Sequence, residues 1–127
     1  MKRNIFFLPL ICTIVLFSSC AKDSKIKQEN FDMKTWKNDP FACKGDREKL
    51  EDDFLSVKDR LLGTSITDIR QILGKPDRVD LDTRSTKQYV YYVTEGSQCK
   101  GKTGEDGKSY KIYFDALELV KEVSPIL

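Results

Sequence analysis

Hydrophobic positions between residues 46 and 62 recur at helical spacing among charged residues. The apolar stripe is formed by Leu50, Phe54, Val57 and Leu61. This spacing predicts one amphipathic helix over Asp46–Leu62, capped at its N-terminus by Asp46 and ended by Gly63. The acidic run over residues 51–53 is typical of a solvated helix face, and a cation site is the alternative interpretation.

A second, shorter helix is predicted over Ser65–Leu73. Ser65 is the expected N-cap, and Asp68 follows three residues later, as in a capping box. Gly74 and Pro76 are typical of the residues that end a helix. The face predicted to be buried consists of Ile66, Ile69, Ile72 and Leu73.

The rest of the chain alternates apolar and polar residues, as strands do. Four strands are predicted, over residues 79–82, 88–94, 110–114 and 119–123. Short connections favour an antiparallel meander. The prediction is therefore an α+β domain over residues 46–127, with two helices packed on a three- to four-stranded sheet in the order ααβββ(β).

The N-terminus has the pattern of an export signal. Lys2 and Arg3 precede an apolar stretch over residues 5–17, which is shorter than the roughly 20 residues a bilayer span needs. Residues 16–20 (LFSSC) resemble the lipobox of bacterial lipoproteins, which implies that residues 1–19 are removed and Cys20 is acylated. An ordinary secretory signal is the alternative. Since Ala21 replaces the aspartate that retains lipoproteins in the inner membrane of other bacteria, the resemblance favours the outer membrane, with the domain facing the periplasm.

Charge and composition exclude several function classes. The net charge of +2 disappears when Lys2 and Arg3 are removed with the signal, so no basic field remains for nucleic acid. The chain has no histidine, which excludes Ser-His or Cys-His nucleophiles and imidazole-bound zinc. We therefore expect no metal, no cofactor and no catalysis.

The chain has four cysteines. Cys12 leaves with the signal and Cys20 is the lipidation candidate, which leaves Cys43 and Cys99. In an oxidising compartment these two are expected to form a disulfide. Two free thiols, or a metal site completed by carboxylates, are the alternatives.

Between the anchor and the first predicted helix, the chain divides in two. Residues 20–30 are predicted to form the anchor and a flexible polar tether, and residues 31–45 are predicted to form an aromatic arm. The only tryptophan, Trp36, either packs on the domain or forms an exposed contact for a partner.

The segment over residues 96–103 (GSQCKGKT) fits a phosphate-loop pattern, but the glycine-containing residues 104–107 that follow it break a helix. It reads instead as part of a polar hairpin loop over residues 95–109, in which Lys102 and Asp106 are candidate partner contacts. Three tyrosines of the second predicted strand are further candidates: Tyr89 and Tyr91 on one face, and Tyr92 on the other. One face packs under the helices and the other is left open for a partner, or is covered by the arm over Phe31–Phe41.

Residues 63–76 (GTSITDIRQILGKP) resemble the signature of the SmpA/OmlA (BamE) lipoprotein family, whose helix–turn pattern the β-lactamase-inhibitor-protein superfamily shares. Residues 89–92 (YVYY) and 112–115 (IYFD) look like two strands of that family. The arm and the cysteine pair look more like those of small Bacteroidetes lipoproteins. The resemblance implies a two-layer fold and a non-catalytic protein.

Three functions are compatible with these features. The first is a lipid-anchored module that binds a protein partner and supports outer-membrane protein assembly or envelope integrity. The second is a periplasmic enzyme inhibitor of the β-lactamase-inhibitor type. The third, an enzyme, would have to use Asp39, Arg47 or the Asp80/Asp82 pair, for which the sequence supplies no complementary base.

Overall fold

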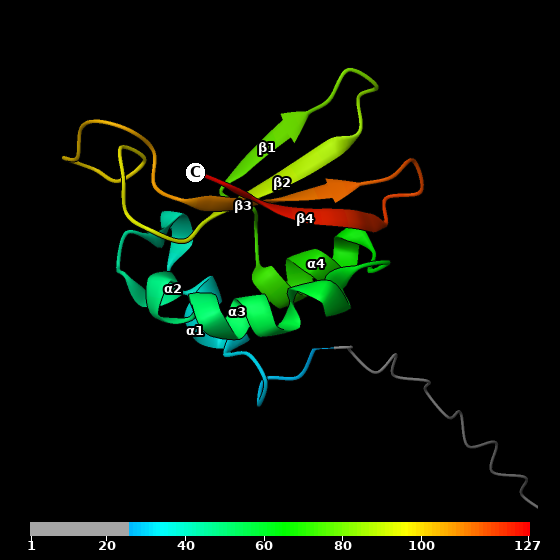
Figure 1. Cartoon of the computed structure of the whole chain (residues 1–127), viewed down its shortest axis with the longest axis horizontal. Helices are drawn as coiled ribbons and strands as arrows, with labels where there is room; N and C mark the ends of the chain where they lie inside the picture. Colours follow the sequence, from blue (N-terminus) through cyan, green and yellow to red (C-terminus); the bar gives the residue numbers. More distant parts are fainter. Residues whose placement is uncertain (1–25) are drawn as a thin grey trace, which may run out of the picture.

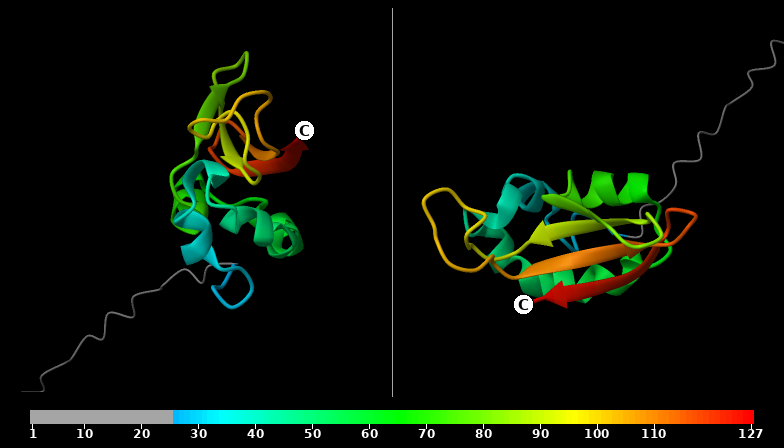
Figure 2. Two further views of the ribbon diagram at one scale, coloured as in Figure 1. Left: turned by 90° about the vertical axis from the view of Figure 1, so that its left-hand side faces the viewer. Right: turned by 90° about the horizontal axis from the view of Figure 1, so that it is seen from above.

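The computed structural model describes residues 26–127. The predicted signal, Cys20 and the first part of the predicted tether lie outside the described residues. Helical elements form one layer and a four-stranded sheet the other, as the two side views show (Figure 1, Figure 2). The predicted α+β class is confirmed.

The sheet is an antiparallel meander in the order β1-β2-β3-β4. The strands are β1 (Arg78–Leu81), β2 (Lys87–Tyr92), β3 (Ser109–Phe114) and β4 (Val120–Ile126). Each begins within one residue of its predicted start, and β4 runs three residues beyond its predicted end. A register shift at Tyr113/Phe114 places a bulge between β3 and β4.

Helix α4 (Ile66–Leu73) matches its prediction. The Ser65 hydroxyl accepts a hydrogen bond from the backbone N–H of Asp68 at 3.2 Å. Gly74 ends the helix with φ of 81°, a conformation that favours glycine. The four residues predicted to be buried are buried. These signals are local, so the sequence alone was sufficient to predict the helix.

The predicted helix over Asp46–Leu62 is wrong in its continuity. The segment forms α2 (Asp46–Lys49), α3 (Glu51–Val57) and the 3-10 helix η2 (Lys58–Leu61). The break lies at Leu50, a residue of the apolar stripe that carries no helix-breaking signal. Asp46 does not cap α2, because Gly45 precedes it in a left-handed conformation and the Asp39 carboxylate accepts the N–H groups of Asp46 and Arg47.

The predicted aromatic arm is part of the helix layer. It forms α1 (Met33–Lys37) and the 3-10 helix η1 (Pro40–Ala42). Phe31 and Trp36 are fully buried, and the Trp36 ring lies 5.0 Å from that of Phe54. Ile26 is also 1% exposed, so the predicted tether over residues 20–30 joins the core by residue 26.

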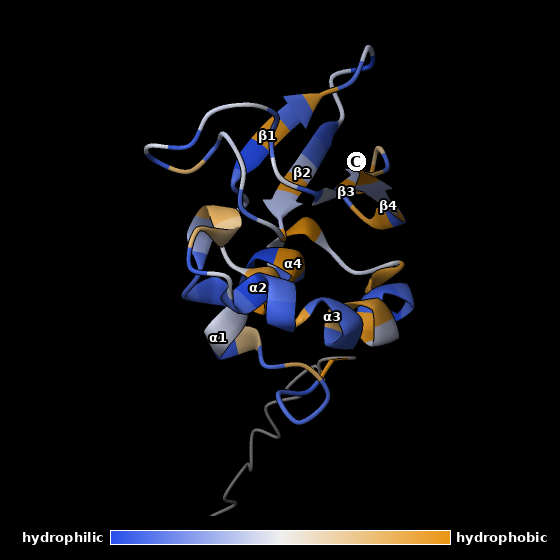
Figure 3. Cartoon of the chain, turned by 60° about the vertical axis from the view of Figure 1, so that its left-hand side comes forward, coloured by the Kyte–Doolittle hydropathy of each residue, from blue (hydrophilic) through white to orange (hydrophobic). Residues whose placement is uncertain are grey.

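The core lies between the two layers, where helix and sheet residues form one cluster. Hydrophobic and hydrophilic residues alternate along the helices (Figure 3), and the buried hydrophobic ones, among them Phe54 and Ile69, belong to this cluster. Tyr89, Tyr91, Ile112 and Phe114 contribute the sheet side of this cluster. With Trp36 and Phe54 opposite them, the core is rich in aromatic contacts, which add to the hydrophobic stabilisation.

A buried ion pair joins the arm, α2 and the sheet. Arg47 Nη1 lies 2.6 Å from Asp77 Oδ2, and both side chains are at most 2% exposed. Arg47 also donates from Nη1 to the Tyr92 carbonyl at 3.1 Å and from Nε to the Trp36 carbonyl at 3.0 Å. Its guanidinium carbon lies 5.0 Å from the centre of the Trp36 ring. Arg47, considered above as a catalytic candidate, therefore has its contacts within the fold.

Replacing Arg47 by methionine is expected to destabilise the fold by about 3–5 kcal/mol, because the Asp77 carboxylate would remain buried without its counter-charge. Urea denaturation measures the change, and Arg60→Met is the matched control because Arg60 is exposed. Equal midpoints for the two variants would contradict a structural role for the pair.

Candidate functional site

The predicted disulfide between Cys43 and Cys99 is confirmed. The sulfur atoms are 1.97 Å apart and the two Cα atoms 5.6 Å apart, and the two cysteines are separated by 56 positions in sequence. The bond ties the end of η1 to the loop between β2 and β3, and these two segments lie at the same end of the molecule (Figure 1).

The β2–β3 loop is folded on itself by its own hydrogen bonds. The Gln98 side chain accepts from the Gly107 N–H at 2.9 Å and donates to the Thr94 carbonyl at 2.8 Å. A Cβ atom on Gly96 would lie 2.0 Å from the Gly107 nitrogen, so the two sides of the loop approach too closely for any other residue at position 96. After Thr103 the chain continues as an irregular loop into β3, without the helix that a phosphate loop requires.

Lys102 and Asp106, the predicted contact residues in this loop, are both exposed. Lys102 pairs with Glu95, also on the loop. The Asp106 carboxylate accepts hydrogen bonds from the Ser97 and Tyr92 hydroxyls, which hold the pKa of Asp106 below its ordinary value. Asp106 therefore presents a fixed negative charge at neutral pH.

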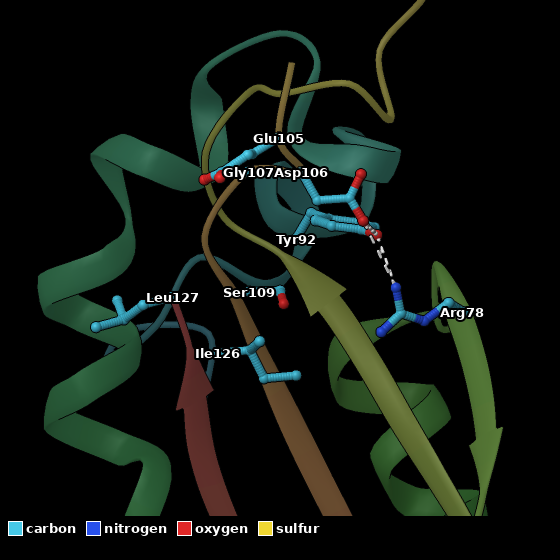
Figure 4. A pocket seen from close by; sticks show the side chains of 8 residues that line it. All are labelled: Arg78, Tyr92, Glu105, Asp106, Gly107, Ser109, Ile126 and Leu127. Carbon is cyan, nitrogen blue, oxygen red and sulfur yellow. Dashed lines mark hydrogen bonds and ion pairs between the residues drawn. The ribbon is translucent and has the colours of Figure 1, made fainter. Parts of the chain in front are cut away.

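A shallow pocket of about 280 Å³ lies between this loop and the ends of the strands (Figure 4). Arg78 and Asp106 form one side of it, and Ile126 the other. Arg78 is held by Asp80 at 2.9 Å and by the Tyr92 hydroxyl at 3.1 Å, so its charge is neutralised within the fold. The volume is at the lower limit for a small-molecule site, and the lining groups are already paired with one another.

Four of the predicted contact residues are buried instead. Their side chains are at most 4% exposed: Trp36, Tyr89, Tyr91 and Tyr92. The helix layer covers Tyr89 and Tyr91, and the Tyr91 hydroxyl donates to the Gly74 carbonyl at 2.9 Å. Tyr92 lies on the opposite face of the sheet, where the Phe41 ring stacks on it at 6.5 Å. Burial, followed by the hydrogen bond to Asp106, raises the pKa of Tyr92.

Phe41 is the exposed aromatic residue of the arm, and it was not singled out as a candidate from the sequence. It is 42% exposed, and both Phe41 and Ala42 have positive φ, at 61° and 57°. Non-glycine residues in this conformation cost about 1–3 kcal/mol each and persist only where the surrounding structure enforces them. The sequence carries one indication of a constrained turn here, because Phe41 lies between Pro40 and the disulfide-bonded Cys43.

Three contacts enforce the conformation of Phe41. Its N–H donates to Asp77 Oδ1 at 3.0 Å, and its carbonyl accepts from Gln98 Nε2 at 3.0 Å. The third contact is the disulfide two residues later. Together with the loop, Phe41 forms an arm–loop surface, which consists of Phe41, the disulfide, Gln98, Lys102 and Asp106.

The carboxylates considered as a possible acid–base pair are engaged separately. Hydrogen bonds from Arg78 and Lys111 lower the pKa of Asp80. Hydrogen bonds from Thr86 and Arg84 lower the pKa of Asp82, whose carboxylate accepts the backbone N–H groups of the β1–β2 turn. Both are therefore ionised at neutral pH, and neither is poised to donate a proton.

Within residues 26–127, no cluster of three or more potential metal ligands occurs, and no helix has the length and hydrophobicity to cross a membrane. Comparison with protein-family models, curated proteins and solved structures gives no match. The choice of the arm–loop surface as the candidate site therefore rests on its geometry alone.

Replacing both Cys43 and Cys99 by serine is expected to reduce the free energy of unfolding by about 4 kcal/mol, as the chain-entropy model gives for a loop of this length. Amide hydrogen exchange over residues 96–106 is expected to accelerate more than exchange in β3, because the disulfide ties this loop to the arm. Thermal denaturation and hydrogen exchange measure the two effects. The unaltered protein with reductant is the control, and a Cys-to-Ser variant as stable as the oxidised protein would contradict the estimate.

Proposed function

We propose that this chain is a lipid-anchored envelope protein that binds a protein partner, without catalysis, through the arm–loop surface. The observation that carries the proposal is Phe41, held half-exposed in a left-handed conformation by Asp77, Gln98 and the disulfide. Strained backbone is concentrated at functional sites, and rigid aromatic anchors are typical of the residues that dominate binding energy.

Charged residues on the β2–β3 loop, whose Gln98 contacts Phe41, support a polar rim beside this anchor. Lys102 and Asp106 are exposed on a loop whose shape is fixed by internal hydrogen bonds. A rigid surface loses little conformational entropy on binding, and opposite charges at the rim orient a partner.

The short connection to the proposed anchor supports a partner at the same membrane. Ile26 is buried, so the chain from Cys20 to the core spans six residue steps, or about 20 Å when fully extended. The proposal places the protein in the outer membrane facing the periplasm. The family resemblance of residues 63–76 suggests partners in outer-membrane protein assembly.

Enzyme inhibition is the second candidate. The observation that favours it is the β2–β3 loop, whose internal hydrogen bonds would let it enter a cleft without rearrangement. Inhibition of a periplasmic hydrolase by the purified protein would support this candidate over an assembly role.

Replacing Cys20 by alanine is expected to release the protein from the membrane fraction, because the thiol that would carry the lipid is lost. The matched control is Cys12→Ala, which lies in the predicted signal and is expected to leave membrane association unchanged. Fractionation together with mass spectrometry of the mature N-terminal peptide checks both variants. An unacylated N-terminal peptide in the unaltered protein would contradict the anchor.

Replacing Phe41 by alanine is expected to reduce partner recovery about tenfold or more, because it removes the aromatic anchor. Affinity purification from detergent-solubilised membranes with quantitative mass spectrometry measures the loss. Lys102→Glu tests the charge of the same surface and also removes the ion pair with Glu95, and Leu117→Ala is the control, since Leu117 is 79% exposed on the distant β3–β4 turn. Equal recovery by the Phe41, Lys102 and Leu117 variants would contradict the assigned surface.

A further inference from the structure

Strand β1 exposes two apolar side chains that the fold does not cover. Val79 is 50% exposed and Leu81 is 66% exposed. They pair in register with Tyr89 and Lys87 of β2, so they point to the helix side of the sheet. The β1–β2 hairpin projects beyond the helix layer (Figure 2, left), and hydrophobic bands are visible on β1 at the sheet edge (Figure 3).

The backbone of the same two residues faces the free edge of the sheet. The Asp82 N–H donates to the Thr86 carbonyl at 3.2 Å, which marks this pair as hydrogen-bonded. Because hydrogen-bonded positions alternate along an antiparallel strand, Asp80 and Arg78 also direct their backbone groups to β2. Val79 and Leu81 then direct theirs outward, where no strand of the described chain pairs with β1.

The opposite edge of the sheet is protected against such pairing. The Val93 N–H donates to the Lys108 carbonyl, which orients the even-numbered residues of β3 towards β2 and the odd-numbered ones towards β4. By the register of β3 with β4, Ser124 faces β3 and Pro125 faces outward. Proline offers no N–H, and the bulge at Tyr113/Phe114 distorts this edge further.

We propose that two copies of this chain pair β1 against β1, antiparallel, about a two-fold axis at Val79. In this register the Val79 backbone groups of both copies bond to each other, which agrees with their outward direction. Arg78 of each copy then lies opposite Asp80 of the other copy, so the interface contains two such pairs. These are non-hydrogen-bonded positions, where facing side chains are closest, about 4.5 Å between Cα atoms.

The charges select this register over its neighbour. A shift of two residues would pair Val79 with Leu81 and Arg78 with Asp82 of the other copy, but it would also place the two Asp80 carboxylates face to face. Like charges directly opposite each other are destabilising, whereas the proposed register sets the Arg78–Asp80 ion pair of one copy against that of the other with the charges alternating in sign. The sequence of β1 is thus complementary to itself in one antiparallel register.

The expected dimer is weak in dilute solution and stronger on a membrane. A four-residue strand buries less area than the roughly 1,200–2,000 Å² of a standard protein interface. Confinement to a surface raises the effective concentration, which favours pairing without new contacts. This last step rests on the proposed lipid anchor, but the pairing itself does not.

The test uses Val79→Cys in the full chain, treated in its native membranes with a short bifunctional thiol reagent. The expected result is a crosslinked species of twice the chain mass. Leu117→Cys controls for random collision, and the unaltered protein controls for any free thiol at Cys20. Crosslinking of Val79→Cys no greater than that of Leu117→Cys would overturn the proposal, and so would an adduct with a different polypeptide.

A second variant keeps the test independent of cysteine chemistry. Val79→Lys places two lysines across the axis, while Leu117→Lys adds the same charge elsewhere on the surface. Sedimentation equilibrium of the full chain in detergent is expected to show a dimer that weakens tenfold or more only with Val79→Lys. A monomer at every concentration for the unaltered protein, with no Val79→Cys crosslink, overturns the pairing and leaves the arm–loop proposal untouched.

Discussion

The buried ion pair between Arg47 and Asp77 is the contact on which the rest of the structure depends. It joins α2 to the segment that leads into β1, and each member organises further backbone groups. Asp77 accepts the N–H groups of Tyr92 and Phe41, so one carboxylate holds the arm against the sheet. A buried charge of this kind contributes less to net stability than to fixing one arrangement, because its removal leaves the other charge unpaired.

The position of the candidate site follows from this pair. Asp77 fixes the Phe41 N–H, Gln98 fixes the Phe41 carbonyl, and the disulfide holds both segments together. The arm–loop surface is therefore built from three segments distant in sequence that no single element could position. Its rigidity comes from polar contacts at the end of the sheet, whereas the aromatic cluster around Trp36 holds the two layers together.

Local signals were enough to predict much of the fold. Helix α4 is specified by Ser65, Asp68 and Gly74 within ten residues, and the meander follows from alternating strands that succeed one another along the chain. The cysteine pair followed from elimination and compartment. These features depend on neighbours in sequence or on a count of one residue type.

Features that depend on distant partners were not predicted. The Asp39 carboxylate takes the place of the expected Asp46 cap, although it lies seven positions away from Asp46 in sequence. Arg47 forms its ion pair with Asp77, which lies thirty positions away. Trp36 and Phe41 are both aromatic residues of the same arm, yet one is buried and the other exposed. Spacing alone does not distinguish them, because the left-handed turn at Phe41 is imposed by the Asp77 and Gln98 side chains.

The Cys43–Cys99 bond also makes a covalent ring of everything from α2 through β2, with the β3–β4 hairpin outside it. A protease that cuts the exposed turn between β1 and β2 would therefore open the ring without separating the two fragments. Each half would stay attached through sulfur until the bond is reduced. The domain can thus remain a single covalent molecule after a nick in the β1–β2 turn.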